Sequence, residues 1–228
     1  LPMYHIFAFT ANLLGFLSIG AHNILVPSPR PVQNLQRAVE NYPLTWMTGV
    51  NTLFNGLLNE EWFLAYPPKH LKASIAGGTA LHSAVAQRWR EVTGTPIAEG
   101  YGLTETSPVV SFNPLSGEPR LGSIGIPAPG TDVRLVSETG QDVPTGEPGE
   151  IWVRGPQVMQ GYWNRPDETA NVIDKDGYFH TGDVGYIDED GYIFIVDRIK
   201  DMVIVNGFKA FPRHVEEAIM KHPAVAEV

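Results

Sequence analysis

Two Asp-Gly-Tyr triplets, at residues 176–178 and 190–192, constrain the fold of this chain more than any other feature of its sequence. Asp-Gly pairs favour the tight turns that join neighbouring β-strands. The alternating residues 192–196 predict a strand that leaves the second turn. Between the triplets lies the polar tetrad 180–183 (His-Thr-Gly-Asp), and residues 197–201 contain four charges. Polar clusters attached to rigid strands often form binding sites, and the alternative is a pair of surface hairpins with solvated tips.

The order of the predicted elements indicates an α/β fold with a mainly parallel sheet. Strand-like apolar runs at residues 44–47, 71–76 and 96–99 alternate with helical patterns at 31–41, 50–58 and 81–92. This alternation is typical of a parallel sheet that is covered by helices. After Pro114, short strands at 122–127, 133–136 and 149–154 are separated by turn residues, which predicts a small, barrel-like β subdomain. A brief helix at 165–172 and an amphipathic helix at 212–221 complete the predicted elements.

These patterns divide the chain into three expected parts. Residues 1–113 are expected to form a partial α/β subdomain, and residues 114–199 a β-rich subdomain. Residues 200–228 are expected to contain a hinge and the start of a further, C-terminal subdomain.

Charge and cysteine content exclude several classes of function. The formal net charge is −9 and the sequence pI is about 5.2, whereas a sequence-independent nucleic-acid binder needs a basic face. The chain contains no cysteine, so disulfides, zinc-thiolate sites and thiol nucleophiles are excluded. We therefore expect no nucleic-acid partner.

Residues 1–29 contain no Asp, Glu, Lys or Arg. A signal peptide would need a basic N-terminal region, which is lacking. A membrane span would have to bury polar residues such as Asn12 and Asn23 in lipid, which is costly. A buried helix followed by a buried strand is the preferred interpretation. Because such a chain would start in the middle of a core, we expect it to be a fragment.

The first candidate binding motif is the run from Gly100 to Pro108, which follows a predicted strand. Its glycines would let the backbone approach a ligand closely. The Tyr101 ring could stack on a base, the Thr104 hydroxyl could bond a phosphate oxygen, and Glu105 could bind Mg²⁺. The alternative is a glycine-rich turn in which Thr104 caps a helix, and the motif by itself does not separate the two.

The second candidate group consists of Asp183 and Arg198. A carboxylate can accept two hydrogen bonds, which suits the neighbouring hydroxyls of a ribose. The guanidinium of Arg198 offers a rigid fork for ribose or phosphate oxygens. The alternatives are an Asx turn for Asp183 and a surface ion pair of Arg198 with Asp197 or Asp201.

Four ordered segments resemble the adenylate-forming superfamily of acyl- and aryl-CoA synthetases, luciferases and peptide-synthetase adenylation domains. They are YGLTE at 101–105, GEIWVRGPQVMQGYWNRPDET at 149–169, DGYFHTGDVGYIDEDGYIFIVDRIKD at 176–201 and VNGFKAFPRHVEE at 205–217. Four motifs in series are a far stronger signal than any one of them. The bacterial long-chain fatty-acid–CoA ligases are the most similar group, through LPMYHIF, GVNTLFNGLLN and EGYGLTETSP.

The resemblance implies part of a large N-terminal domain, with an α/β subdomain and a β-barrel-like subdomain, and the start of a small α+β C-terminal subdomain. It also implies roles for residues of the first motif. Tyr101 would stack on adenine with Gly77 and Gly78 behind the base, and Gly102 belongs to the same nucleotide-binding motif. Thr104 would contact the α-phosphate of ATP, and Glu105 would bind Mg²⁺.

The remaining implied roles lie elsewhere in the chain. Asp183 and Arg198 would hold the ribose, and Lys200 would be the hinge about which the C-terminal subdomain turns. Gly207 would lie beside the channel for the pantetheine arm of coenzyme A. His5 matches a position near the substrate carboxylate, and its alternative is a core histidine.

The implied reaction joins a fatty acid to CoA with ATP and Mg²⁺, through an acyl-adenylate. Other acyl- or aryl-CoA ligases, and adenylation domains that load a carrier protein, are the alternatives. The family's phosphate loop and catalytic lysine are expected before Leu1 and after Val228, so the isolated chain is expected to be an inactive nucleotide-binding fragment. The expected location is the cytoplasm, with peripheral membrane association and oligomeric state left open.

Overall fold

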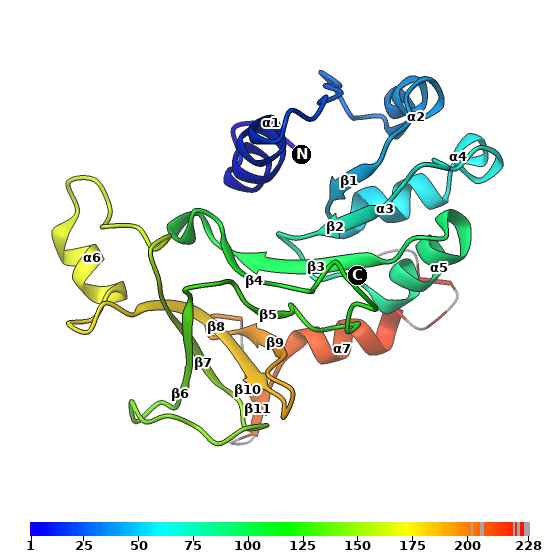
Figure 1. Cartoon of the computed structure of the whole chain (residues 1–228). Coiled ribbons are helices and arrows are strands. Elements are labelled where there is room, and N and C mark those ends of the chain that lie inside the picture. Colours follow the sequence, from blue (N-terminus) through cyan, green and yellow to red (C-terminus); the bar gives the residue numbers. More distant parts are fainter. Residues whose placement is uncertain (202, 206–207, 221, 223, 226–228) are drawn as a thin grey trace. The chain divides into compact units, whose positions relative to one another are not determined.

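The computed structural model describes residues 1–201, 203–205, 208–220, 222 and 224–225, and the chain forms two units, Leu1–Gly122 and Ser123–Val228 (Figure 1). Strands and helices alternate in the first unit, whereas antiparallel strands dominate the second. The predicted α/β class with a separate β-rich part is confirmed. The predicted three-part division with boundaries after residues 113 and 199 stays a prediction.

The sheet of the first unit has the strand order β1-β2-β3-β4. Its first three strands are parallel, as predicted, and β4 is antiparallel to β3. Glu99 on β3 is the register partner of Ala76 on β2, which in turn pairs with Gly49 on β1. The carboxyl ends of the parallel strands therefore lie at one edge of the sheet. The strands are β1 (Trp46–Gly49), β2 (Ala73–Ala76), β3 (Ile97–Gly102) and β4 (Val109–Phe112).

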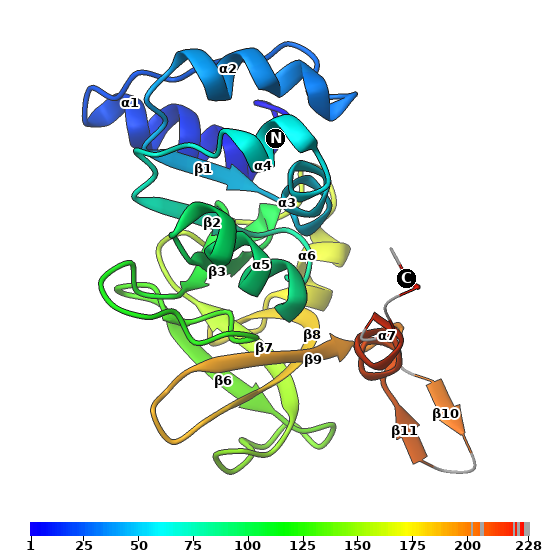
Figure 2. The same cartoon turned by 90° about the vertical axis from the view of Figure 1, so that its right-hand side faces the viewer.

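Helices α3 (Asn51–Leu58) and α5 (Ser83–Thr93) pack beside each other in the first unit (Figure 2). Between them, the rings of Phe54 and Trp89 meet edge to face at 4.8 Å, which adds to the stabilisation from apolar burial. The buried Trp89 indole N–H donates to Ser74 Oγ on β2 at 3.0 Å, so the aromatic core leaves this donor satisfied. The other helices of this part are η2 (Val32–Leu35), α2 (Gln36–Asn41) and α4 (Glu61–Ala65).

The prediction for the N-terminal segment is wrong in two respects. Helices η1 (Ala8–Gly15) and α1 (Phe16–Ser18) do form, but Leu14 is 52% exposed and Ile19 beyond them 76% exposed. Residues 19–31 contain no strand, because glycine and prolines interrupt them. One polar side chain faces the sheet instead: Asn12 Nδ2 donates to Thr48 Oγ1 on β1 at 2.7 Å.

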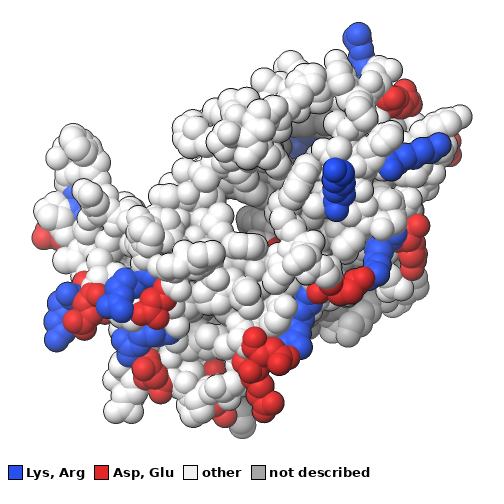
Figure 3. Space-filling view, in the orientation of Figure 1, with Lys and Arg blue, Asp and Glu red and all other residues white. Residues whose placement is uncertain are grey.

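The surface over this N-terminal segment is uncharged, and elsewhere on the same face acidic and basic side chains are interspersed (Figure 3). Across the described part of the chain, no helix has the length and apolar character needed to cross a bilayer.

The second unit is built on a four-stranded antiparallel sheet in the order β6-β7-β8-β9. A two-stranded antiparallel pair, β10 with β11, follows it in the chain. The sheet strands are β6 (Asp132–Val136), β7 (Gly149–Arg154), β8 (Phe179–Ile187) and β9 (Ile193–Arg198). The other elements are β5 (Ile126–Pro127), α6 (Pro166–Val172), β10 (Val203–Val205), β11 (Phe208–Ala210) and α7 (Pro212–Met220).

The polar tetrad 180–183, which lies between the two triplets, is part of β8. The second Asp-Gly-Tyr triplet does join β8 to β9, whereas the first leads the chain from α6 into β8. Within the strand, His180 pairs with Trp152 on β7, and Asp183 pairs with Arg198 on β9. Between these pairs the ladder is irregular, and side-chain oxygens accept the N–H groups of Gly182 and Asp183 instead.

An aspartate two residues before each triplet organises the turn, and the sequence patterns did not single it out. Asp174 Oδ1 accepts the N–H groups of Asp176 and Tyr178, each at 2.9 Å. Asp188 Oδ1 does the same for Asp190 at 3.0 Å and Tyr192 at 2.9 Å. Each carboxylate thus satisfies two backbone donors that no strand ladder reaches.

Burial raises the pKa of the Asp174 carboxyl, but the N–H groups of Tyr178 and Asp176, and the nearby His180, outweigh burial and bring the pKa below its ordinary value of 3.8. A lowered pKa stabilises the fold above pH 3.8, and this contribution disappears as the pH falls through the lowered value. We expect Asp174→Asn, which keeps one acceptor but loses the charge, to cost about 1 kcal/mol at pH 7.

Thermal unfolding at a series of pH values checks this prediction: the deficit of Asp174→Asn should shrink below pH 3.8. Asp176→Asn is the matched control, because the Asp176 side chain is exposed and should change stability by less than about 0.5 kcal/mol. Equal deficits for both variants, or a deficit of Asp174→Asn that is independent of pH, would contradict the assignment.

Candidate functional site

Glycines bring the carboxyl ends of β1, β2 and β3 close together. The Gly77 N–H donates to the carbonyl of Gly49 at 3.3 Å. A Cβ atom added to Gly77 would lie 3.2 Å from the Gly100 oxygen and 3.2 Å from Phe7 Cε1. Gly78 has φ +82°, a conformation that side chains disfavour. Ligands of open α/β sheets bind outside such carboxyl ends, so this edge is the candidate site of the first unit.

The motif at 100–108 continues β3 to Gly102 and then forms the short helix η3 (Thr104–Thr106). The residue before the helix is Leu103, so the alternative of Thr104 as the helix cap is wrong. The buried Thr106 takes the capping role: its Oγ1 accepts the Leu103 N–H at 2.9 Å. This leaves Thr104 exposed and Glu105 half-buried at the carboxyl edge.

Glu105 fits the part of a single magnesium ligand. Over the described residues, no three acidic or histidine side chains gather into a metal-binding cluster. Mg²⁺ bound with a nucleotide usually takes only one or two protein carboxylates and completes its shell with phosphate oxygens and water. The half-buried, accessible Glu105 suits that arrangement, and its role stays a prediction.

The second glycine of the motif is required by the chain itself. A Cβ atom at Gly102 would lie 1.6 Å from the oxygen of Pro108, which no relaxation of a side chain could relieve. The Leu103 N–H donates to the same oxygen at 3.1 Å and closes the loop. The close approach expected at this motif is therefore, at Gly102, an approach of two backbone segments.

We expect Gly102→Ala to destabilise the fold by more than about 3 kcal/mol, because the added methyl group meets backbone that cannot move aside. Gly56→Ala in α3 is the control: its Cβ would meet nothing closer than Val32 Cγ2 at 3.9 Å, and the helix should gain about 0.5–1 kcal/mol. Soluble yield and thermal unfolding of the two variants check the contrast, and similar stability of both would refute it.

Asp183 and Arg198 lie together in the second unit. They are register partners on β8 and β9, and Arg198 Nε lies 3.1 Å from Asp183 Oδ1. The Asp183 side chain is 6% exposed, and that of Arg198 is 56% exposed. The Asp197 carboxylate accepts the backbone N–H of Arg198 at 2.7 Å. The pair predicted to hold a ribose is thus a buried carboxylate with an accessible guanidinium beside it.

Two neighbours fix the backbone next to Asp183. Gly182 has φ +73°, and its N–H donates to Glu150 Oε1 on β7 at 3.0 Å. Thr181 Oγ1 accepts the Asp183 N–H at 3.1 Å and donates to the carbonyl of Ile151 at 2.8 Å. Glu150 also accepts the Trp152 indole N–H at 2.9 Å. The sequence patterns did not single out Glu150, because Gly182 lies on another strand and 32 residues away.

The other predicted site residues are more isolated. His5 is exposed and its Nδ1 accepts the Phe7 N–H at 3.2 Å, so the alternative of a core histidine is wrong. Lys200 lies exposed in the turn after β9. Gly207 lies outside the described residues. The predicted roles of all three stay predictions.

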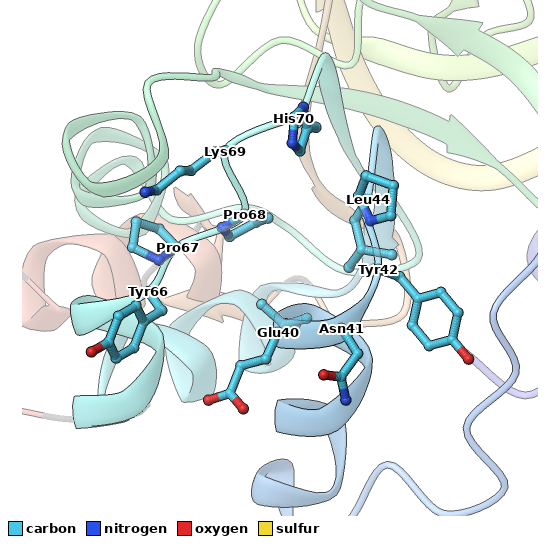
Figure 4. A pocket seen from close by; sticks show the side chains of 11 residues that line it. Glu40, Asn41, Tyr42, Leu44, Tyr66, Pro67, Pro68, Lys69 and His70 are labelled. Atoms are coloured by element: carbon cyan, nitrogen blue, oxygen red, sulfur yellow. The ribbon is translucent and has the colours of Figure 1, made fainter.

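A cavity of about 560 Å³ lies elsewhere in the first unit, lined by residues 39–44 and 66–70 (Figure 4). These segments lead into the amino ends of β1 and β2. The cavity is therefore at the opposite end of the parallel strands from the glycine-lined edge, and it holds none of the predicted site residues. The general position of ligands in such sheets favours the carboxyl edge.

A model of the AMP-binding enzyme family matches residues 1–163. The chain is 50% identical to a long-chain-fatty-acid–CoA ligase of Yersinia pestis, over 100% of this chain and 40% of that protein. It superposes on ATP-bound MatB from Rhodopseudomonas palustris with a TM-score of 0.89 and 34% identity, covering 99% of this chain and 44% of that one. An anthranilate CoA ligase in complex with anthranoyl-AMP gives a TM-score of 0.92 at 29% identity, covering 99% of this chain and 43% of that one.

Proposed function

The chain belongs to the AMP-binding enzyme family, and from this membership we propose that the full-length protein is an ATP-dependent long-chain fatty-acid–CoA ligase. The observation that supports the proposal best is the 50% identity to a protein of that name, which extends over the whole chain. The chain spans about 40% of the length of that relative. The proposed location is the cytoplasm, where ATP and CoA are both supplied.

The proposed reaction has two steps because a carboxylate is a poor electrophile. In the first step, a fatty-acid oxygen attacks the α-phosphorus of ATP, the bond to pyrophosphate breaks, and an acyl-adenylate forms. In the second step, the CoA thiol loses its proton and attacks the acyl carbon, and AMP leaves with the electron pair of the broken C–O bond. The sulfur comes from CoA, so the lack of cysteine in this chain is no obstacle.

In this proposal, the carboxyl edge of the first unit holds the base and the phosphates. Tyr101 stacks on adenine, and the absent side chain at Gly77 lets the base approach the backbone. The exposed Thr104 hydroxyl donates to an α-phosphate oxygen. Mg²⁺, held by Glu105, would neutralise charge on the phosphate oxygens. These groups act by binding and orienting rather than by covalent chemistry.

Asp183 and Arg198 serve the ribose in the same proposal. The buried carboxylate accepts hydrogen bonds from the ribose hydroxyl groups, and the guanidinium of Arg198 lies beside it as the opposite charge. Because Arg198 remains half-exposed, its guanidinium can also donate to a sugar or phosphate oxygen.

The full-length enzyme tests the proposed function directly. With ATP, Mg²⁺ and CoA, a long-chain fatty acid should give acyl-CoA, AMP and pyrophosphate in equal amounts. A short-chain acid and an aromatic acid such as ferulate should react with a kcat/KM at least tenfold lower. Release of ADP and phosphate, or a preference for the aromatic acid, would overturn the proposal.

Asp183→Ala in the full-length enzyme should raise the KM for ATP by about tenfold to a hundredfold, because a hydrogen bond to a charged group contributes about 1.5–3 kcal/mol. The KM for the fatty acid should stay within about twofold. Asp167→Ala, which removes an exposed acid of α6, is the control and should change neither constant. An unchanged ATP KM in Asp183→Ala, with thermal unfolding like the wild type, would remove Asp183 from the ribose site.

A further inference from the structure

Glu99 is a buried carboxylate that the proposed chemistry does not use. It lies in the middle of β3 and is 7% exposed. Its two oxygens accept backbone protons from two different segments: Oε2 from the Leu81 N–H at 3.4 Å, and Oε1 from the Gly122 N–H at 3.2 Å. A buried acidic group needs such donors to offset its lost hydration.

Glu99 connects the two segments that are proposed to enclose the base: it bonds to one through Leu81 and lies on the other. Leu81 lies in the connection between β2 and α5, which begins with Gly77 and Gly78. Glu99 itself lies two residues before Tyr101 on the same strand. One side chain therefore ties the glycine turn to the strand that presents the aromatic ring.

A second layer holds the backbone of Glu99 in place. Asn113, which is 1% exposed, donates both its N–H and its Nδ2 to the carbonyl of Glu99, at 2.9 Å and 3.2 Å. Its Oδ1 accepts the Arg120 N–H at 2.9 Å. The segment 120–122 is thus hydrogen-bonded both to Asn113 and to the Glu99 carboxylate. A shift of Glu99 would therefore disturb this segment as well.

The chemistry of the two donors explains why a carboxylate is needed there. Two N–H groups converge on one side chain, so both of its terminal atoms must be acceptors. An ionised glutamate satisfies this requirement, whereas glutamine would present its own NH₂ group to one of the two donors. A buried N–H group that lacks an acceptor is destabilising. In Glu99→Gln, the segment that carries this N–H group would therefore be displaced, and that segment is either the glycine turn or the 120–122 loop.

We propose that Glu99 is a positioning residue that sets the separation between the Gly77–Gly78 turn and Tyr101, and thereby the affinity and selectivity of the protein for an adenine base. This inference rests on the proposed function, because it assumes that these two segments enclose adenine. Glu99 touches no reacting atom in this scheme and acts only through the backbone of Leu81 and of its own strand.

The test uses Glu99→Gln in the full-length enzyme, with a non-hydrolysable ATP analogue and its GTP counterpart as probes. The Kd for the ATP analogue, measured by calorimetry without fatty acid or turnover, should rise about tenfold. The preference for the ATP analogue over the GTP analogue should fall by a similar factor. At saturating ATP, kcat and the KM for the fatty acid should stay within twofold. Glu91→Gln, in which an exposed acid on α5 is neutralised, should change none of these values.

A purely structural role predicts a different result. Lower thermal stability and a lower kcat, with unchanged Kd and unchanged base preference, would overturn the proposal. If Glu99→Gln does not fold, Asn113→Ala is the decisive variant, because it removes the side-chain bonds to the Glu99 carbonyl and to the 120–122 loop. A raised Kd for the ATP analogue would support the proposal, and an unchanged Kd would overturn it. Because the calorimetry needs no turnover, a wild-type enzyme that binds the ATP analogue but ignores fatty acids would refute the proposed function and leave the test of Glu99 intact.

Discussion

Acidic side chains that accept backbone N–H groups are the interaction on which the arrangement of this protein depends. Glu99 joins two connections of the first unit, and Glu150 bonds the left-handed Gly182 beside Asp183. Asp174 and Asp188 organise the turns that lead into and out of β8. In each case one carboxylate satisfies donors that the strand ladders do not reach, and an unsatisfied donor would cost about 1–3 kcal/mol. The acids at these positions are therefore part of the framework.

Glycines provide the second constraint, and most of the close approaches they allow are between parts of the chain itself. Cβ atoms at Gly102 and Gly185 would lie 1.6 Å from Pro108 O and 2.6 Å from Phe194 O. The approach at Gly77 is also to the chain but is looser, because an added Cβ would lie 3.2 Å from Gly100 O and from Phe7 Cε1. A motif glycine can therefore be required by packing, by the ligand or by both. The sequence does not distinguish these requirements, whereas the distances between backbone atoms reveal the requirement from packing.

The two groups of candidate residues differ in what holds them. In the first unit, Tyr101 lies on β3 and Glu105 follows this strand, which is held by bonds of Glu99 and Asn113. In the second, Asp183 sits within an antiparallel strand and is paired across the ladder with Arg198. The first group depends on hydrogen bonds between loops, and the second depends on the pairing register of β8 and β9. Substitutions near the first group should therefore disturb the loops, whereas substitutions near the second should disturb the strand pairing.

The sequence by itself determined the α/β class, the mainly parallel sheet and the turns at the Asp-Gly-Tyr triplets. Each of these follows from local information, since periodicity and turn chemistry involve residues a few positions apart. The family was indicated by the resemblance of four motifs in series. The sequence did not reveal the exposure of the N-terminal helix, the antiparallel β4 or the placement of the tetrad inside β8. Nor could it reveal the role of Glu99, whose partners lie 18 and 23 residues away. Tertiary structure decided these features, because burial and the pairing of buried polar groups depend on which distant segments meet.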